Sequence, residues 1–193
     1  HELSFGFHTT FYNFKPGDLS PTSDQSNTKT IRMPNEMSIE SALYFGDAFQ
    51  LNQQLHLEAG LRLSMFNRIG SGLVYGYQSG SPLEPKNIVD STQYESGEIM
   101  KTYVGPEPRL SLRYSIGKLA SIKFGYNRIY QYVHLISSST AGSFLDVWHP
   151  STTIVEPGIA DQISLGYFRN FANNQYESSI EIYPNPATHF LKL

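Results

Sequence analysis

The sequence of 193 residues contains no cysteine, which excludes a disulfide framework and thiolate metal sites. Charged residues are also scarce, at 16% of the chain, and the net charge of −3 leaves no basic footprint for nucleic acid. No run of 18 apolar residues occurs, so no transmembrane helix is expected. No charged-then-apolar leader precedes the first strand-like residues, so we expect that a leader was removed or that the chain is a piece of something longer.

Catalytic motifs are missing as well. No glycine-rich phosphate loop precedes a helix, and no His-Glu-x-x-His motif indicates a metal centre. His134, Asp146 and His149, with the serine run at 137–139, have the residue types of a hydrolase triad. They lie in one predicted loop with no scaffold to fix them, so we interpret them as polar loop residues. The sequence therefore predicts no enzyme, no metal site and no cofactor.

Strand-forming side chains are abundant, with 13 Tyr and 12 Phe. Leu55–Met65 alternates without a break: apolar residues occupy the odd positions, and polar residues or glycine occupy the even ones. Because side chains alternate across a strand, this segment has one apolar face and one polar face. Its length of about 11 residues suits a tilted strand that crosses a bilayer.

The same alternation predicts seven strands. They are expected at about residues 3–12, 39–51, 55–65, 109–116, 120–130, 163–167 and 180–182, with a bulge near Arg128 where the alternation changes phase. Long irregular segments (about 15–35, 67–98 and 133–159) alternate with short turns (52–54, 117–118 and 173–174). In an antiparallel meander this places every long loop at one end and every tight turn at the other. Outer-membrane barrels are built this way, so we predict an all-β, antiparallel, up-and-down transmembrane β-barrel segment.

Two groups of side chains are candidate contact residues. The polar faces of the predicted strands carry five charged residues that would face a hydrated lumen: Glu58, Arg62, Arg109, Arg113 and Lys123. There the four cationic side chains are solvated, attract an anionic ligand or pair with a plug. The predicted outer loops carry five residues that are candidates for ligand binding: Tyr75, Tyr77, Tyr94, Trp148 and His149. Aromatic girdles at membrane interfaces are an equally good explanation of loop aromatics.

Several segments carry a signal besides the alternation of apolar and polar residues. Ala42–Leu51 followed by Leu55–Leu63, then Pro108–Tyr114 and Phe124–Arg128, resemble strands of TonB-dependent outer-membrane receptors in the same order. Gln131–Ser137, Asp146–Ser151 and Ala160–Phe168 are similar to the Bacteroidetes branch of that family. The resemblance covers nearly all of residues 1–183.

The resemblance implies a protein of the outer membrane that takes up a large nutrient with energy relayed by TonB. Its partners would be outer-membrane lipid, a plug domain, TonB and a surface lipoprotein. Members of the family have an N-terminal plug and a 22-stranded barrel, whereas this chain has about seven strands. Since seven strands cannot close so wide a barrel, we expect a fragment of the barrel wall or the product of a broken gene.

The C-terminus departs from the family. Two prolines, Pro184 and Pro186, are expected to stop the last strand, so we divide the chain into a partial barrel at 1–183 and a non-barrel tail at 184–193. The stretch Tyr183–Thr188 is similar to the start of a type IX secretion sorting domain. Two alternatives stay open: a complete small outer-membrane barrel with a structural or adhesive role, and a secreted soluble β-domain with a sorting tail.

Overall fold

The structure, a computed structural model, describes residues 1–20, 30–32, 34–136 and 147–188. Seven strands form one antiparallel sheet in the order β1 (Glu2–Phe14), β4 (Glu36–Gln50), β5 (Leu55–Tyr77), β6 (Ile88–Ile116), β7 (Ala120–Gln131), β10 (Gly158–Phe171) and β11 (Tyr176–Ile182). The remaining elements are short: the ladders β2 (Asp18–Leu19) with β3 (Ile31–Arg32) and β8 (Val133–Ile136) with β9 (Val147–Pro150), β12 (Ala187–Thr188) on β10, and a 3-10 turn at Pro85–Asn87. The predicted all-β antiparallel meander is confirmed.

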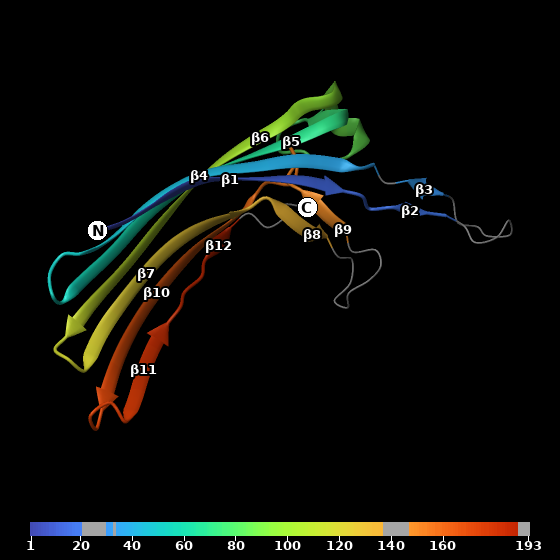
Figure 1. Ribbon diagram of the computed structural model, residues 1–193. Helices are drawn as coiled ribbons and strands as arrows, with labels where there is room; N and C mark the ends of the chain where they lie inside the picture. Colours follow the sequence, from blue (N-terminus) through green and yellow to red (C-terminus); the bar gives the residue numbers. More distant parts are fainter. Residues whose placement is uncertain (21–29, 33, 137–146, 189–193) are drawn as a thin grey trace.

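The sheet is strongly curved and open (Figure 1). Its edge strands are β1 and β11, which do not pair with each other in the described part of the chain. Tight turns join the strands at one end, whereas the hairpin tip and the long segments around β2–β3 and β8–β9 lie at the other. Closure into a barrel therefore stays a prediction. No helix among the described residues is long and apolar enough to span a membrane.

Strand register carries the apolar alternation across the whole sheet. One row joins Phe5, Phe45, Leu61 and Pro108, and another joins Leu57, Leu112, Phe124, Leu165 and Ile182. These rows form the convex face, which is largely exposed; Phe5 keeps 77% of its surface and Ile182 keeps 62%. The exposed band runs from Leu3 to Phe11 in β1 but from Ile163 to Phe171 in β10, so it slants across the strands.

Few apolar side chains are buried. Within the described residues they are Ala42, Phe66, Met100 and Tyr132. Among the described residues, the sheet thus lacks the second apolar layer that a soluble domain packs against its first.

Strands β5 and β6 are much longer than predicted. We expected an irregular region at 67–98, and this was wrong, because β5 continues to Tyr77 and β6 begins at Ile88. The ladder absorbs three register irregularities, between Arg68 and Ile69, Gly70 and Gly72, and Gly76 and Tyr77. Gly70, Gly72 and Gly76 lie at or beside these irregularities. Gly70 also leaves space for a neighbour, since a Cβ there would lie 1.9 Å from the Met100 sulfur.

The bulge expected near Arg128 is absent. The β7–β10 register runs unbroken from Gln131 to Ala120, and Arg128 lies opposite Asp161. The pattern changes phase because β7 separates from β6 beyond Asn127, so that later side chains face new neighbours.

Two prolines explain this separation. The Ser115 N–H donates to the Gln54 carbonyl on the β5 side of β6 (2.7 Å). Because successive N–H positions of a strand point to opposite neighbours, positions 106 and 108 point toward β7. Both positions are proline, which has no N–H to donate. The β6–β7 ladder accordingly ends at Arg109 and Asn127.

The C-terminal prolines act differently. β11 ends at Ile182, but the following residues stay beside β10. The Pro184 carbonyl accepts a hydrogen bond from the Ile163 N–H (3.1 Å), and the Pro186 carbonyl accepts one from the Asp161 N–H (3.0 Å). Proline is tolerated here because this segment lies at the sheet edge and contributes only carbonyl acceptors to the hydrogen bonds with β10. The division of the chain at residue 184 stays a prediction.

Candidate functional site

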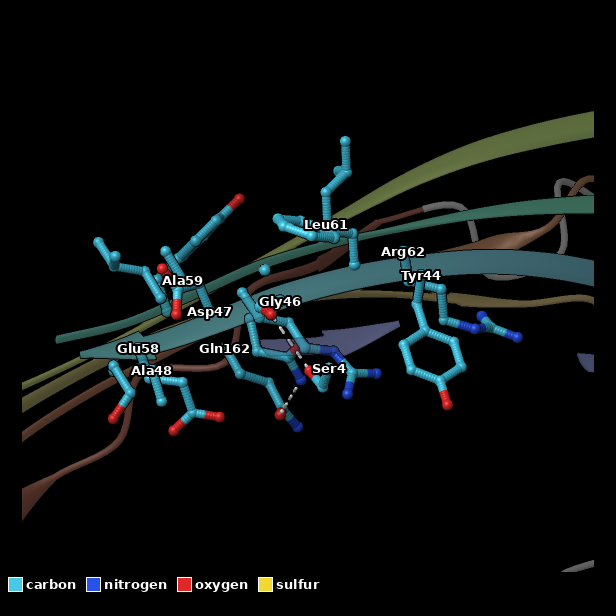
Figure 2. A pocket seen from close by; sticks show the side chains of 18 of the residues that line it. Ser4, Tyr44, Gly46, Asp47, Ala48, Glu58, Ala59, Leu61, Arg62 and Gln162 are labelled. Carbon is cyan, nitrogen blue, oxygen red and sulfur yellow. Dashed lines mark hydrogen bonds between the residues drawn. The ribbon is translucent and has the colours of Figure 1, made fainter. Parts of the chain in front are cut away.

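The polar side chains gather on the concave face, around a trough of about 1180 Å³. Figure 2 shows Ser4, Tyr44, Arg62 and Gln162 on the trough side of the sheet, with Leu61 on the opposite side. Along each of these strands, successive side chains point to opposite faces of the sheet. The same strands therefore supply both the apolar rows and the trough. The trough is deep at its centre because the residues there are glycines, which have no side chain: Gly46, Gly60 and Gly125.

Three of the five charged residues predicted to face the lumen line the trough. They are Glu58, Arg62 and Arg109. Arg113 and Lys123 lie on the same face nearer the tight turns, directly opposite each other in the β6–β7 register. The Lys123 ammonium lies 4.3 Å from the centre of the Phe168 ring. Whether this face borders a lumen remains a prediction.

Arg62 is the centre of an ion network. Its guanidinium donates to a Glu40 carboxylate oxygen at 2.9 Å and to a Glu107 carboxylate oxygen, and the Tyr12 hydroxyl donates to the other oxygen of Glu40 at 3.1 Å. Glu107 is 1% exposed. Arg109, by contrast, has no ion pair among the described residues and is exposed. Arg62 is therefore already paired with two carboxylates, whereas the Arg109 guanidinium is available to bind a ligand.

The acidic partners of Arg62 were missed in the sequence. Glu40 had a usable signal, because it lies on the polar face of β4, two residues from Ser38 and Ala42. Glu107 had no such signal, because the prolines on either side of it, Pro106 and Pro108, argue against a strand at that position.

The loop aromatics do not form one site. Tyr75 and Tyr77 line a second cavity of about 480 Å³ with Pro82, Leu83 and Ile154 near the tip of the β5–β6 hairpin. Tyr94 lies on β6 opposite Gly72 and does not line that cavity. All three tyrosines were expected in loops, which was wrong because the hairpin there is extended.

Trp148 and His149 occupy alternate sides of β9. Trp148 is 54% exposed, opposite Leu135 of β8. The His149 ring points to β4, with Nε2 3.3 Å from a Glu36 carboxylate oxygen. That hydrogen bond, more than any other contact, raises the pKa of His149 above its ordinary value.

Residues of the rejected triad are partly described. The His134 Nε2 lies 3.1 Å from the Ser151 hydroxyl, and burial lowers the pKa of His134. Asp146 and residues 137–139 lie outside the described residues. No group of three or more His, Cys, Asp or Glu side chains gathers as a metal site in the described part of the chain.

Comparison with known protein families, with curated proteins and with solved structures finds no match to this chain. The arrangement is suited to binding: an open polar trough lined by exposed charges such as Arg109, on a sheet whose other face is apolar and is not covered by the described residues.

Proposed function

We propose that the chain is part of the wall of a transmembrane β-barrel in an outer membrane, with its convex face in lipid and its trough facing the lumen. The exposed apolar rows that cross all seven strands carry this proposal. A contiguous apolar surface of that extent is rare on soluble proteins and indicates a surface that is covered. Polar residues alternate with it toward the trough, as in barrels with a hydrated interior.

The barrel we propose is that of a TonB-dependent receptor for active uptake of a large nutrient. The collinear strand segments, the long connections at one end and the open edges β1 and β11 support it. Open edges in lipid leave backbone groups unsatisfied, at several kcal/mol each, so the sheet needs further strands beside it. The plug domain, TonB and a surface lipoprotein are partners of the complete receptor.

The orientation of the two faces is testable because the chain has no cysteine. Single cysteines replace Leu61 and Leu63 on the convex face, or His56 and Glu58 on the trough face, and carry an environment-sensitive fluorophore. The full chain is folded into phosphatidylcholine vesicles. We expect brominated lipid to quench the two convex labels and aqueous iodide to quench the two trough labels.

Two outcomes would contradict the proposal. One is equal access of iodide to all four labels. The other is a chain that stays monomeric and soluble without detergent, which would favour the secreted β-domain.

The receptor assignment has its own test. Coding DNA upstream of His1 is expected to encode a plug domain in the same frame. Uptake by that full-length protein is expected to require TonB. A heat-modifiable, closed barrel formed by the 193 residues alone would instead identify the small-barrel alternative.

A further inference from the structure

The floor of the trough contains two adjacent positions without a side chain. Gly46 of β4 and Gly60 of β5 lie directly opposite each other in the ladder. Among the described residues, a Cβ at Gly60 would meet only main-chain atoms of β4, the nearest being the Phe45 carbonyl oxygen at 3.2 Å. A Cβ at Gly46 would lie 2.9 Å from the Ser4 hydroxyl oxygen, the end of a side chain that can move. We call Gly46 and Gly60 the glycine recess.

An aromatic ring borders the glycine recess without filling it. Tyr44 lies two residues before Gly46 on the trough side of β4 and is 44% exposed. Its ring lies over Gly6 of β1, where a Cβ would be 2.6 Å from the Tyr44 Cζ atom. Figure 2 shows the Tyr44 and Glu58 side chains on the trough side of the sheet, to either side of Gly46. The recess therefore stays open between them.

Two charged side chains of opposite sign flank the glycine recess. Gly60 pairs with Arg109 and Glu58 pairs with Ser111, so Glu58 and Arg109 are diagonal neighbours on β5 and β6. Both are exposed and line the trough. In the described part of the chain neither forms an ion pair, whereas Arg62, two residues from Gly60, is paired with two carboxylates. Diagonal neighbours on adjacent strands are about 7–8 Å apart.

The two free charges indicate which class of ligand fits. A simple anion that is attracted by Arg109 is repelled by Glu58, and a simple cation meets the opposite pair of forces. A ligand that carries both charges is attracted by both residues. In an extended peptide, side chains two residues apart lie on the same face and are roughly 7 Å apart along the chain, which matches the diagonal spacing. Glycines below such a peptide allow its backbone to approach the sheet closely.

We propose that the glycine recess is a peptide-binding subsite, in which Glu58 binds a basic side chain and Arg109 binds an acidic side chain two residues away in an extended peptide. The peptide backbone crosses Gly46 and Gly60 beside the Tyr44 ring. The subsite rests on the proposed function in that the trough must face water, and it makes oligopeptides the class of nutrient that the trough accepts.

The test measures peptide binding to the folded full chain in micelles of a neutral polyoxyethylene detergent, by saturation-transfer difference NMR. The probe is acetyl-Lys-Gly-Glu-amide, whose blocked ends leave only the two side-chain charges. We expect it to bind about fivefold more tightly than the peptides in which Gln replaces its Lys or its Glu, as solvated ion pairs allow. Acetyl-Lys-Glu-Gly-amide has the same charges on adjacent residues, which point to opposite faces, and is expected to bind as weakly as the singly charged peptides.

Matched variants of the chain assign each charge to its partner. Glu58→Gln is expected to remove the preference for Lys over Gln in the probe, and Arg109→Gln to remove the preference for Glu over Gln. Arg113→Gln, on the same face of β6 but outside the trough lining, is expected to keep both preferences. Gly46→Val fills the recess and is expected to weaken binding of the probe at least fivefold with unchanged far-UV circular dichroism.

Three results would overturn the subsite: equal binding of the doubly and singly charged peptides, equal binding of acetyl-Lys-Glu-Gly-amide, or tighter binding of the neutral sugar maltotriose. Each of them leaves the proposed function standing as long as aqueous iodide quenches the trough labels in vesicles. Trough labels that iodide does not reach would contradict the proposed function and the subsite together.

Discussion

Arg62 and Arg109 illustrate how the same residue on the same face can have different roles. Arg62 joins two carboxylates, one of them almost fully buried, whereas Arg109 has no ion pair among the described residues. Removing one partner of a buried ion group is costly because the other partners stay behind as uncompensated charges. Removing a solvated charge has little effect.

We therefore predict that Arg62→Met lowers the free energy of unfolding by about 3 kcal/mol, because Glu40 and Glu107 then lie close together unpaired. The matched control Arg109→Met is expected to change it by less than about 0.5 kcal/mol. Urea unfolding in detergent micelles measures both. A change of less than about 0.5 kcal/mol for Arg62→Met as well would show that the network contributes little stability.

A second prediction concerns Gly105. A Cβ there would lie 2.6 Å from the Tyr130 ring and 2.6 Å from the Tyr132 hydroxyl. Gly105→Ala is expected to cost about 1–3 kcal/mol through overpacking against Tyr130 and Tyr132. Gly72→Ala is the control, since its Cβ would meet only the end of Met100 at 3.6 Å. Unchanged urea midpoints for Gly105→Ala would contradict the tight packing.

At the scale of elements, alternation in the sequence was enough to find the strands and their two faces, because both depend on local spacing. The extension of β5 and β6 was not predictable in this way. Gly70, Gly72 and Gly76 indicate a loop locally, and only the partner strand shows that they sit in a ladder. The network of Arg62 was equally hidden, since Glu40 and Glu107 are 22 and 45 residues away.

The outer part of the β5–β6 hairpin is expected to be dispensable. Beyond the pair Gly72 and Tyr94, the described residues of β5 and β6 pair only with one another in the sheet. Replacing residues 73–93 by an Asn-Gly turn should lower the strand content by circular dichroism only by the share removed, and should change the free energy of unfolding by less than about 0.5 kcal/mol. Loss of the folded sheet in this variant would show that the tip, with its tyrosine-lined cavity, supports the rest of the wall.

At the scale of the whole molecule, the sorting of long and short connections predicts a fixed orientation in a membrane. Ser81 lies at the hairpin tip and Lys118 lies in the tight turn between β6 and β7, at opposite ends of the sheet. In outer membranes the long loops face outward and the tight turns face the periplasm. The sequence alone distinguishes the two ends of the sheet, because the length of each connection between strands is a local property of the sequence.

The corresponding test uses cells that produce the chain, or its full-length parent, with Ser81→Cys or Lys118→Cys. A membrane-impermeant maleimide added outside should label Ser81→Cys on intact cells and Lys118→Cys only after permeabilisation. Labelling of both sites on intact cells, or of neither, would contradict the orientation.

The slant of the exposed apolar band has a geometric consequence. Its middle lies near Phe7 in β1 and near Tyr167 in β10, and register carries these positions to Leu63 and Leu55 of β5, eight residues apart. Eight residues are roughly 26 Å along a strand, and the five strand spacings from β1 to β10 are about 24 Å across. A band held level by lipid would thus incline the strands by about 45°, at the upper end of the strand tilt of closed barrels. Any strand added beside β1 or β11 has to join at the next step of that same pitch.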